Sequence, residues 1–221
     1  MSLITYKDVA NNAEIKIYIQ RADESLIRMG YTEHSLAHVV RSATVAHNIL
    51  SEMGYDERTC ELARIAGYMH DIGNVVNRVD HAQSGAVMAF RILDKMGMGA
   101  DELSLIITAI GNHDEHTAFP VSALAAALIL ADKSDVRRSR VRNKDIATFD
   151  IHDRVNYAVE RSALAIDKEN KIFTLLITID TGMCQVSDYF EIFLERMLLC
   201  RRAAQFFDCK FALNINDTRL M

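Results

Sequence analysis

The sequence has one proline in 221 residues, Pro120, and no tryptophan. Because proline disrupts the interior of an α-helix, its scarcity favours long helices. No apolar run approaches the ~20 residues needed to cross a bilayer, and the longest, residues 123–131, is expected to be a buried helix. The N-terminus lacks a basic segment followed by an apolar run, so we predict no signal peptide, no membrane association and a cytoplasmic location.

Cysteine pairs and an excess of basic charge are also absent. None of the four cysteines (Cys60, Cys184, Cys200 and Cys209) falls in a CxxC pair. A thiolate zinc site and a disulfide framework are therefore not expected. We expect the cysteines to be buried thiols in a reducing compartment. The net charge of −5 argues against a general nucleic-acid coat, so no nucleic-acid partner is expected.

The first 140 residues show the apolar period of helices separated by short polar breaks, which predicts an all-helical bundle. Helices are expected over residues 8–29, 35–52, 56–72, about 80–97, 100–114 and 121–136. Ser35 and Asp56 stand where N-caps are expected, and Asp101 lies near the start of its helix.

The pattern changes after about residue 145. Two β-rich runs surround the polar residues 167–171, which predicts a hairpin, and residues 186–207 form an amphipathic helix that Ser187 is expected to cap. One further strand is expected near residues 209–217. We therefore predict a mainly α protein with a helical domain over 1–145 and a small ββαβ appendage over 146–221 that covers the site, pairs across a dimer or binds a regulator.

Five predicted helices each carry a His or Asp on a mostly apolar face at helical spacing. These residues are His38, His70, His81, His113 and Asp132. A lone histidine on such a face is more often a satisfied core residue than a ligand. Asp132 is harder to explain, because burying an unpaired ion costs on the order of several kcal/mol and Lys133 is expected to point away from it. Imidazole and carboxylate groups pooled in a core, without thiolates, suit Fe, Mn, Zn, Ni or Co.

His38, the His70-Asp71 pair followed by Ile72-Gly73, and the downstream Asp132 occur in an order that resembles the HD-domain superfamily of metal-dependent phosphohydrolases. The resemblance covers roughly residues 30–142 and implies the helical fold of that family. It implies that His38, His70, Asp71 and Asp132 bind one divalent transition metal ion. His81 and His113 resemble the added ligands of members that hold two metals, with Asp71 bridging the ions and a metal-activated hydroxide as nucleophile.

The sequence departs from the family at two positions. Asn74 stands where HDIG proteins often have lysine, which removes a cation expected to face phosphate. Asp114 stands where many two-metal members have a second histidine. Three roles are possible for Asp114: it binds a metal ion, it acts as a base, or it faces water. Both departures concern the substrate rather than the metal centre.

The candidate catalytic residues are Asp71, His70, His34 and Lys133. Further residues are candidates for substrate contact. His34, four residues before His38, can face the same way and is expected to contact substrate. In the basic segment 133–144, one or two of Lys133, Arg137, Arg138 and Arg140 are expected to reach an anionic substrate, as is Asn74 at the site. His116 is expected at the rim, and His47 and His152 on the surface.

The leading hypothesis is a hydrolase of a small phosphate ester or anhydride, in particular a nucleotide. Two alternatives remain open: a di-iron oxygenase, which the HD resemblance also allows, and a metal-stabilised sensor or interaction module without turnover. A homodimer is the simplest expectation for the apolar, aromatic-rich helix and strands of the appendage.

Overall fold

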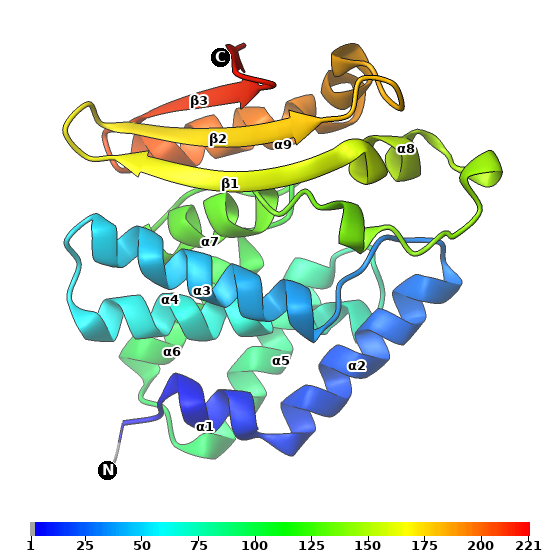
Figure 1. The fold of residues 1–221 in the computed structure, drawn as a ribbon. Coiled ribbons are helices and arrows are strands. Elements are labelled where there is room, and N and C mark those ends of the chain that lie inside the picture. Colours follow the sequence, from blue (N-terminus) through cyan, green and yellow to red (C-terminus); the bar gives the residue numbers. More distant parts are fainter. Residues whose placement is uncertain (1–2) are drawn as a thin grey trace.

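The computed structural model describes residues 3–221, and helices form the part of the chain before residue 134 (Figure 1). The helices of this part are α1 (Tyr6–Asn11), α2 (Ala13–Arg28), α3 (Leu36–Glu52), α4 (Glu57–Met69), α5 (His81–Met96), α6 (Ala100–Gly111) and α7 (Ala123–Lys133). A short 3₁₀ helix, η1 (Ile72–Val75), follows α4 directly. The predicted helical bundle is confirmed.

The helix boundaries show which local signals act in the chain. Ser35 accepts a hydrogen bond from the Ala37 N–H and caps α3, and Asp56 accepts one from the Thr59 N–H and caps α4, as predicted. The single helix expected over residues 8–29 is wrong. Asn12 has ψ 120°, and its side chain accepts from the N–H groups of Glu14 and Ile15, so the chain ends α1 and caps α2 at that residue.

The C-terminal part contains the predicted strands and one helix that was not predicted. It consists of η2 (Arg138–Arg140), η3 (Ile146–Thr148), α8 (Ile151–Ala158), β1 (Val159–Asp167), β2 (Ile172–Ile179), α9 (Val186–Phe206), β3 (Lys210–Ile215) and β4 (Thr218–Arg219). The predicted cap of α9 is wrong: the helix begins at Val186, and Gln185 rather than Ser187 is the N-cap and forms a capping box with Asp188. The predicted ββαβ order is present, extended by the short β4.

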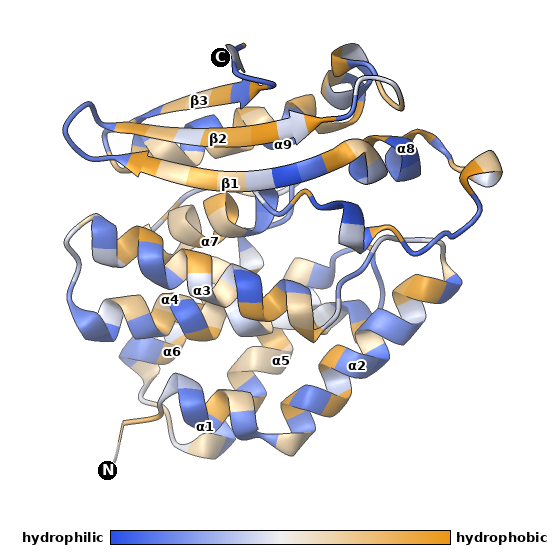
Figure 2. Cartoon of the chain, viewed as in Figure 1, coloured by the Kyte–Doolittle hydropathy of each residue, from blue (hydrophilic) through white to orange (hydrophobic). Residues whose placement is uncertain are grey.

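The four strands form one sheet in the order β1-β2-β3-β4. Strands β1 and β2 are an antiparallel hairpin, whereas β2 and β3 are parallel and are therefore joined by a crossover through α9. Alternate residues of β2, from Phe173 to Ile179, are buried, so one face of the strand packs in the core. Figure 2 shows β2 as mostly hydrophobic and the segment around η2 as hydrophilic.

Helix α7 joins the bundle to the appendage. It contacts α3 and α4 on the bundle side and α9 on the other, so all its residues except the first, Ala123, are buried. The buried apolar residues of both parts form one continuous core, which includes all four cysteines. The division at residue 145 stays a prediction. Within residues 3–221, every helix is too short or too polar to span a membrane.

Two glycines allow the helices to approach closely where the polar residues gather. A Cβ built on Gly67 in α4 lies 2.7 Å from Ala43 Cα in α3. A Cβ built on Gly73 in η1 lies 2.0 Å from the His81 carbonyl oxygen at the start of α5. Any side chain at Gly73 therefore separates η1 from α5, and with them Asp71 from His81.

Candidate metal centre

The six predicted metal ligands converge at one place inside the bundle. They come from α3, the end of α4, the start of α5, the end of α6 and α7, and all are buried: His38, His70, Asp71, His81, His113 and Asp132. His38 Nε2 lies 3.2 Å from Asp132 Oδ1, and His70 Nε2 lies 3.7 Å from the same oxygen. The helical spacing in the sequence therefore corresponds to a real cluster.

Asp71 stands between two groups of imidazoles. Its Oδ2 lies 3.3 Å from His70 Nε2 and 3.6 Å from His38 Nε2. Its Oδ1 lies 3.5 Å from His81 Nε2 and 4.0 Å from His113 Nε2. Each carboxylate oxygen faces a different pair of histidines, which is the arrangement that a bridging ligand requires.

Backbone carbonyls orient three of the four imidazoles. His70 Nδ1 lies 2.8 Å from Gly67 O, His81 Nδ1 lies 3.0 Å from Arg78 O, and His113 Nδ1 lies 2.6 Å from Ile110 O. A carbonyl oxygen only accepts, so in each ring Nδ1 carries the proton and Nε2 is directed into the cluster. The helix ends thus fix both the tautomer and the direction of each ligand.

The fourth imidazole is oriented by a residue that the sequence analysis missed. Asp135 Oδ2 accepts from His38 Nδ1 at 2.8 Å, and Asp135 is fully buried. Arg41 Nε lies 3.0 Å from Asp135 Oδ1, and Arg137 Nε lies 2.5 Å from the same oxygen. The hydrogen bonds from His38 and Arg137 and the charge of Arg140 overcome the effect of burial and hold the pKa of Asp135 far below its usual value, so the residue stays ionised.

Charge is distributed unevenly over the ligands in the absence of metal. Burial lowers the pKa of His81 and His113, so both are neutral. Burial also opposes the charge of His70, but the Asp71 and Asp132 carboxylates outweigh it and raise the pKa of His70 to about 10. Despite burial, His70 and Lys133 hold the pKa values of Asp71 and Asp132 well below the usual range.

Several buried atoms of the cluster lack a hydrogen-bond partner among the described residues: His38 Nε2, His70 Nε2 and Asp71 Oδ2. In addition, the unprotonated Nε2 atoms of His81 and His113 face each other at 3.2 Å. Such atoms are costly to bury unless a cation lies between them. Three overlapping sets of ligand atoms are close enough to hold a metal ion: His38, His70 and Asp71; His70, His113 and Asp132; and Asp71, His81 and His113.

The expectation that Lys133 is a poor partner for Asp132 is wrong. The long side chain folds back, and its Nζ lies 2.6 Å from Asp132 Oδ2 and 3.5 Å from Glu115 Oε1. Glu115 also accepts from Arg196 Nε at 2.9 Å. Burial would raise the pKa of Glu115, but Arg196 and Lys133 lower it to about 2. An ionic chain therefore runs from a ligand of the cluster to α9 of the appendage.

The position of Asn74 explains part of the departure from the lysine common in HDIG proteins. Its side-chain amide donates to Asp71 Oδ1 at 2.9 Å, so Asn74 orients the bridging carboxylate. Its Oδ1 accepts from Arg78 Nη1 at 3.3 Å, and the same nitrogen lies 3.2 Å from His81 Nε2. Arg78, in the loop between η1 and α5, thus provides a cation beside the cluster that was not predicted.

The other departure, Asp114, lies at the edge of the cluster. Its Oδ1 is 3.9 Å from His81 Nε2, and its side chain is 18% exposed. Asp114 therefore has access to both the cluster and solvent.

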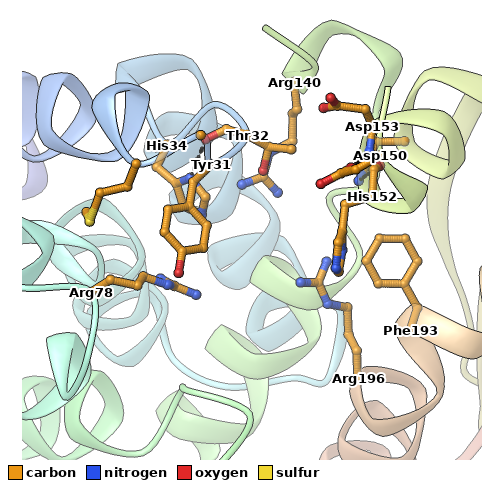
Figure 3. Close-up of a pocket in the computed structure, with 13 residues that line it drawn as sticks. Tyr31, Thr32, His34, Arg78, Arg140, Asp150, His152, Asp153, Phe193 and Arg196 are labelled. Atoms are coloured by element: carbon orange, nitrogen blue, oxygen red, sulfur yellow. Dashed lines mark hydrogen bonds between the residues drawn. The ribbon is translucent and has the colours of Figure 1, made fainter. Parts of the chain in front are cut away.

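A cavity of about 330 Å³ opens beside the cluster (Figure 3). It is lined by Met29, Gly30, Tyr31, Thr32, His34, Arg78, Arg140, Asp150, His152, Asp153, Asn156, Phe193 and Arg196. His34 joins it to the cluster, because its ring lies 5.6 Å from the ring of His38. Burial lowers the pKa of His34 well below its usual value, and its Nδ1 lies 2.7 Å from Thr32 O, so His34 presents an unprotonated Nε2.

The predicted substrate-contacting residues divide into two groups. His34 and Arg140 line the cavity. Arg137 pairs with Asp135, and Arg138 donates to the Tyr157 carbonyl oxygen, so both side chains are used within the fold. Arg78 and Arg196 line the cavity without having been predicted, because neither lies in the basic segment 133–144.

The remaining histidines lie outside the cluster. His116 is exposed, as expected of a rim residue. His47 is half-buried on α3, with Nε2 3.4 Å from Glu57 Oε1. His152 is exposed, as expected, and lines the cavity.

Comparison with known proteins shows the family of the chain. The HD domain family model matches residues 35–154, which is more than half of the chain. Ribonuclease Y of Opitutus terrae is 30% identical over 148 residues, covering 67% of this chain and 26% of the relative. Ribonuclease Y of a Sulfurovum species is 32% identical over 146 residues, covering 65% and 25%. The chain thus spans about a quarter of the length of these relatives.

Among solved structures, a predicted HD superfamily hydrolase from an uncultured Thermotogales bacterium is 27% identical with a TM-score of 0.45, covering 56% of this chain and 67% of that chain.

Proposed function

Because the chain belongs to the HD domain family, we propose that it is a metal-dependent phosphohydrolase that acts on a small phosphate ester or anhydride, in particular a nucleotide. The observation that carries the proposal is the position of Asp71, whose two oxygens face separate pairs of imidazoles. This arrangement favours two divalent transition metal ions. His38, His70, Asp71 and Asp132 would hold one ion, and Asp71, His81 and His113 the other.

Divalent ions at such a site lower the pKa of water and polarise phosphoryl oxygens. In the reaction, hydroxide adds to phosphorus, the bond from phosphorus to the leaving oxygen breaks, and that oxygen takes up a proton. The residues of the chain orient these groups. The carbonyl-bound imidazoles and Asp135 hold the ligand geometry, and Asn74 fixes the direction of the Asp71 carboxylate.

The cavity supplies the contacts to the substrate. Arg78 and Arg140 place positive charge beside the cluster, where a phosphoryl group lies when it is attacked. His34 differs from them, because its unprotonated Nε2 accepts hydrogen bonds. We propose that His34 binds a hydroxyl group of the substrate or a water molecule, and that Lys133 acts by positioning Asp132.

A second candidate substrate is RNA, which is favoured by the similarity to proteins named Ribonuclease Y. The shape of the cavity favours the small substrate, because about 330 Å³ accommodates a compound of nucleotide size rather than a folded nucleic acid. A single-stranded end remains compatible with this volume.

The test is hydrolysis by protein loaded with Mn, Fe, Co, Ni or Zn. The panel contains nucleoside mono-, di- and triphosphates and a short single-stranded RNA. We expect release of phosphate or of a nucleotide from a small compound, and loss of that activity in His70→Ala. His47→Ala is the matched control, because His47 lies on α3 away from the cluster. Equal turnover by wild type and His70→Ala would refute the proposal, and cleavage of RNA alone would support the second candidate.

A homodimer stays a prediction. Light scattering coupled to size exclusion distinguishes a mass of one chain from that of two.

A further inference from the structure

The appendage contributes directly to the cavity beside the metal centre. Phe193 and Arg196 of α9 line it, together with Asp150, Asp153 and Asn156 in and before α8. In Figure 3 the side chains of Arg78, Arg140 and Arg196 enter the cavity from three different parts of the chain. Arg78 and Arg140 belong to the segment matched by the HD domain family, whereas Arg196 lies beyond it.

Arg196 is held in place by two contacts that leave part of its guanidinium group available. Its Nε–H donates to Glu115 at 2.9 Å, and its Cζ lies 4.6 Å from the centre of the Phe193 ring. Both contacts fix the plane of the group. Since Glu115 takes the Nε–H, the two terminal amino groups remain for a ligand in the cavity.

Arg140 is prepared in a similar way. Its Nε donates to Glu33 O at 2.9 Å and its Nη1 donates to Asp135 O at 2.8 Å, both of them neutral carbonyl oxygens. The nearest carboxylate contact is 4.0 Å, to an Asp135 oxygen that His38 and Arg137 also contact. Arg140 is therefore a buried cation with a weak counter-charge, and its Nη2 remains for a ligand.

Three guanidinium groups line the cavity against two carboxylates, and both carboxylates already accept hydrogen bonds within the fold: Asp150 Oδ1 accepts from the Asp153 N–H at 2.8 Å, and Asp153 Oδ2 accepts from Asn143 at 3.2 Å. Arg78 already lies beside the cluster, because its Nη1 contacts His81 Nε2 and Asn74 Oδ1. Arg140 and Arg196 then bring two further guanidinium groups to the same enclosed space, where they repel each other unless an anion lies between them. A second anionic group on the ligand satisfies this requirement.

We propose that Arg196 of the appendage, together with Arg140, binds a second anionic group of the substrate, so that the appendage completes the substrate site and selects compounds with two phosphates, or a phosphate and a carboxylate, over monophosphates. This inference rests on the proposed hydrolysis. It assigns the appendage a role in substrate selection.

The test compares adenosine 5′-monophosphate with adenosine 5′-diphosphate and adenosine 3′,5′-bisphosphate as substrates of the manganese-loaded full chain. We expect kcat/KM to be higher for at least one two-phosphate compound. Arg196→Gln should lower kcat/KM for that compound by about tenfold or more, and should reduce its ratio to the monophosphate. Arg196→Lys retains the positive charge but lacks the planar guanidinium group, so its kcat/KM for that compound should lie between those of the wild type and Arg196→Gln.

Arg202→Gln is the matched control, because Arg202 is exposed on the same helix, and it should leave the ratio unchanged. Metal content and melting temperature are measured for each variant, and Arg196→Lys gives the comparison if Arg196→Gln does not fold. A wild-type preference for the monophosphate, or a ratio unaffected by changes at Arg196, would overturn the inference.

Failure of the proposed hydrolysis gives a different result. If the loaded protein hydrolyses none of the three compounds, their binding is measured by isothermal titration. Weakening of two-phosphate binding by about tenfold in Arg196→Gln but not in Arg202→Gln then supports the anion site. Equal binding by both variants, or no binding by wild type, overturns it.

Discussion

The metal centre and the neighbouring cavity are built in different ways. The ligands of the metal centre stand on or directly beside helix ends, and backbone carbonyls of their own turns orient three of them. The cavity is assembled from the loop after α2, the segment after η1, the region around η2, and the helices α8 and α9. The first site depends on local helical geometry, and the second depends on how distant segments pack.

This difference has a chemical counterpart. The metal centre combines two carboxylates with four imidazoles, of which those of His81 and His113 are neutral, whereas the cavity carries three guanidinium groups and two carboxylates. The two sites meet at three points: His34 beside His38, Arg78 beside His81, and the chain from Asp132 through Lys133 and Glu115 to Arg196. Substitutions in the metal centre should therefore affect metal binding, and substitutions in the cavity should affect substrate selection.

The largest effect is expected at Asp71. In Asp71→Asn one oxygen of the bridge is replaced by an amide nitrogen, which does not bind a metal ion. We expect loss of the second ion and a fall in kcat of at least about a hundredfold. Metal content and steady-state kinetics check this, and Asp208→Asn, an exposed position, is the control. Retention of two ions and of turnover would contradict the bridging role.

Gly73→Ala tests whether close packing of η1 on α5 holds the metal centre together. A Cβ at this position meets the His81 carbonyl oxygen at 2.0 Å, which the backbone has to relieve by moving. We expect a loss of about 3 kcal/mol in the free energy of unfolding, measured in urea. Gly111→Ala is the control, because its Cβ makes an ordinary 3.7 Å contact, and its effect should be no more than about 1 kcal/mol. Equal effects of the two substitutions would show that the close approach has no energetic role.

Asp135→Asn weakens the metal centre from outside it. The substitution removes the negative charge that stabilises the orientation of His38. We expect manganese affinity to fall by about 10- to 100-fold, as measured by titration calorimetry. Asp145→Asn, at an exposed residue, is the control. An affinity unchanged by Asp135→Asn would mean that helix α3 alone orients His38.

The smallest expected effect is the release of protons when the metal-free protein binds metal. In the metal-free protein the pKa of His70 is about 10, so the ring is protonated at pH 8. His81 and His113 have lowered pKa values and are already neutral. Metal ions bind neutral imidazole, so loading at pH 8 should release at least about one proton per chain, from His70, and a further one where metal-bound water ionises. Calorimetry in buffers of different ionisation enthalpy measures this number, and a value near zero would contradict the protonation of His70.

The sequence predicted the two regions to different extents, for physical reasons. His38, His70, His81, His113 and Asp132 were found because a helical period places them on inward faces. The prediction for Lys133 was wrong because the angular position of a residue on a helix fixes only the direction of its Cβ. The four-carbon side chain of Lys133 can fold back to reach Asp132. Asp135 gave little signal, because it follows the end of α7 in a polar and basic segment, and it was not interpreted as a partner of His38.

Other features had weaker signals. Asn12 interrupts a continuous helical period, and only the competition of its side chain with the backbone ends α1 there. Arg78 and Arg196 are ordinary surface-type residues in the sequence. Their position at the cavity follows from the path of the loop after η1 and from the docking of α9 on α7, which sequence periodicity does not encode.

The most direct test of the central claim is the anomalous scattering of manganese in crystals of the loaded protein. Two peaks are expected, one among His38, His70, Asp71 and Asp132 and the other among Asp71, His81 and His113, with one oxygen of Asp71 toward each. Peaks located elsewhere, or His38, His70 and Asp132 without bound metal in crystals that contain manganese, would contradict the central claim.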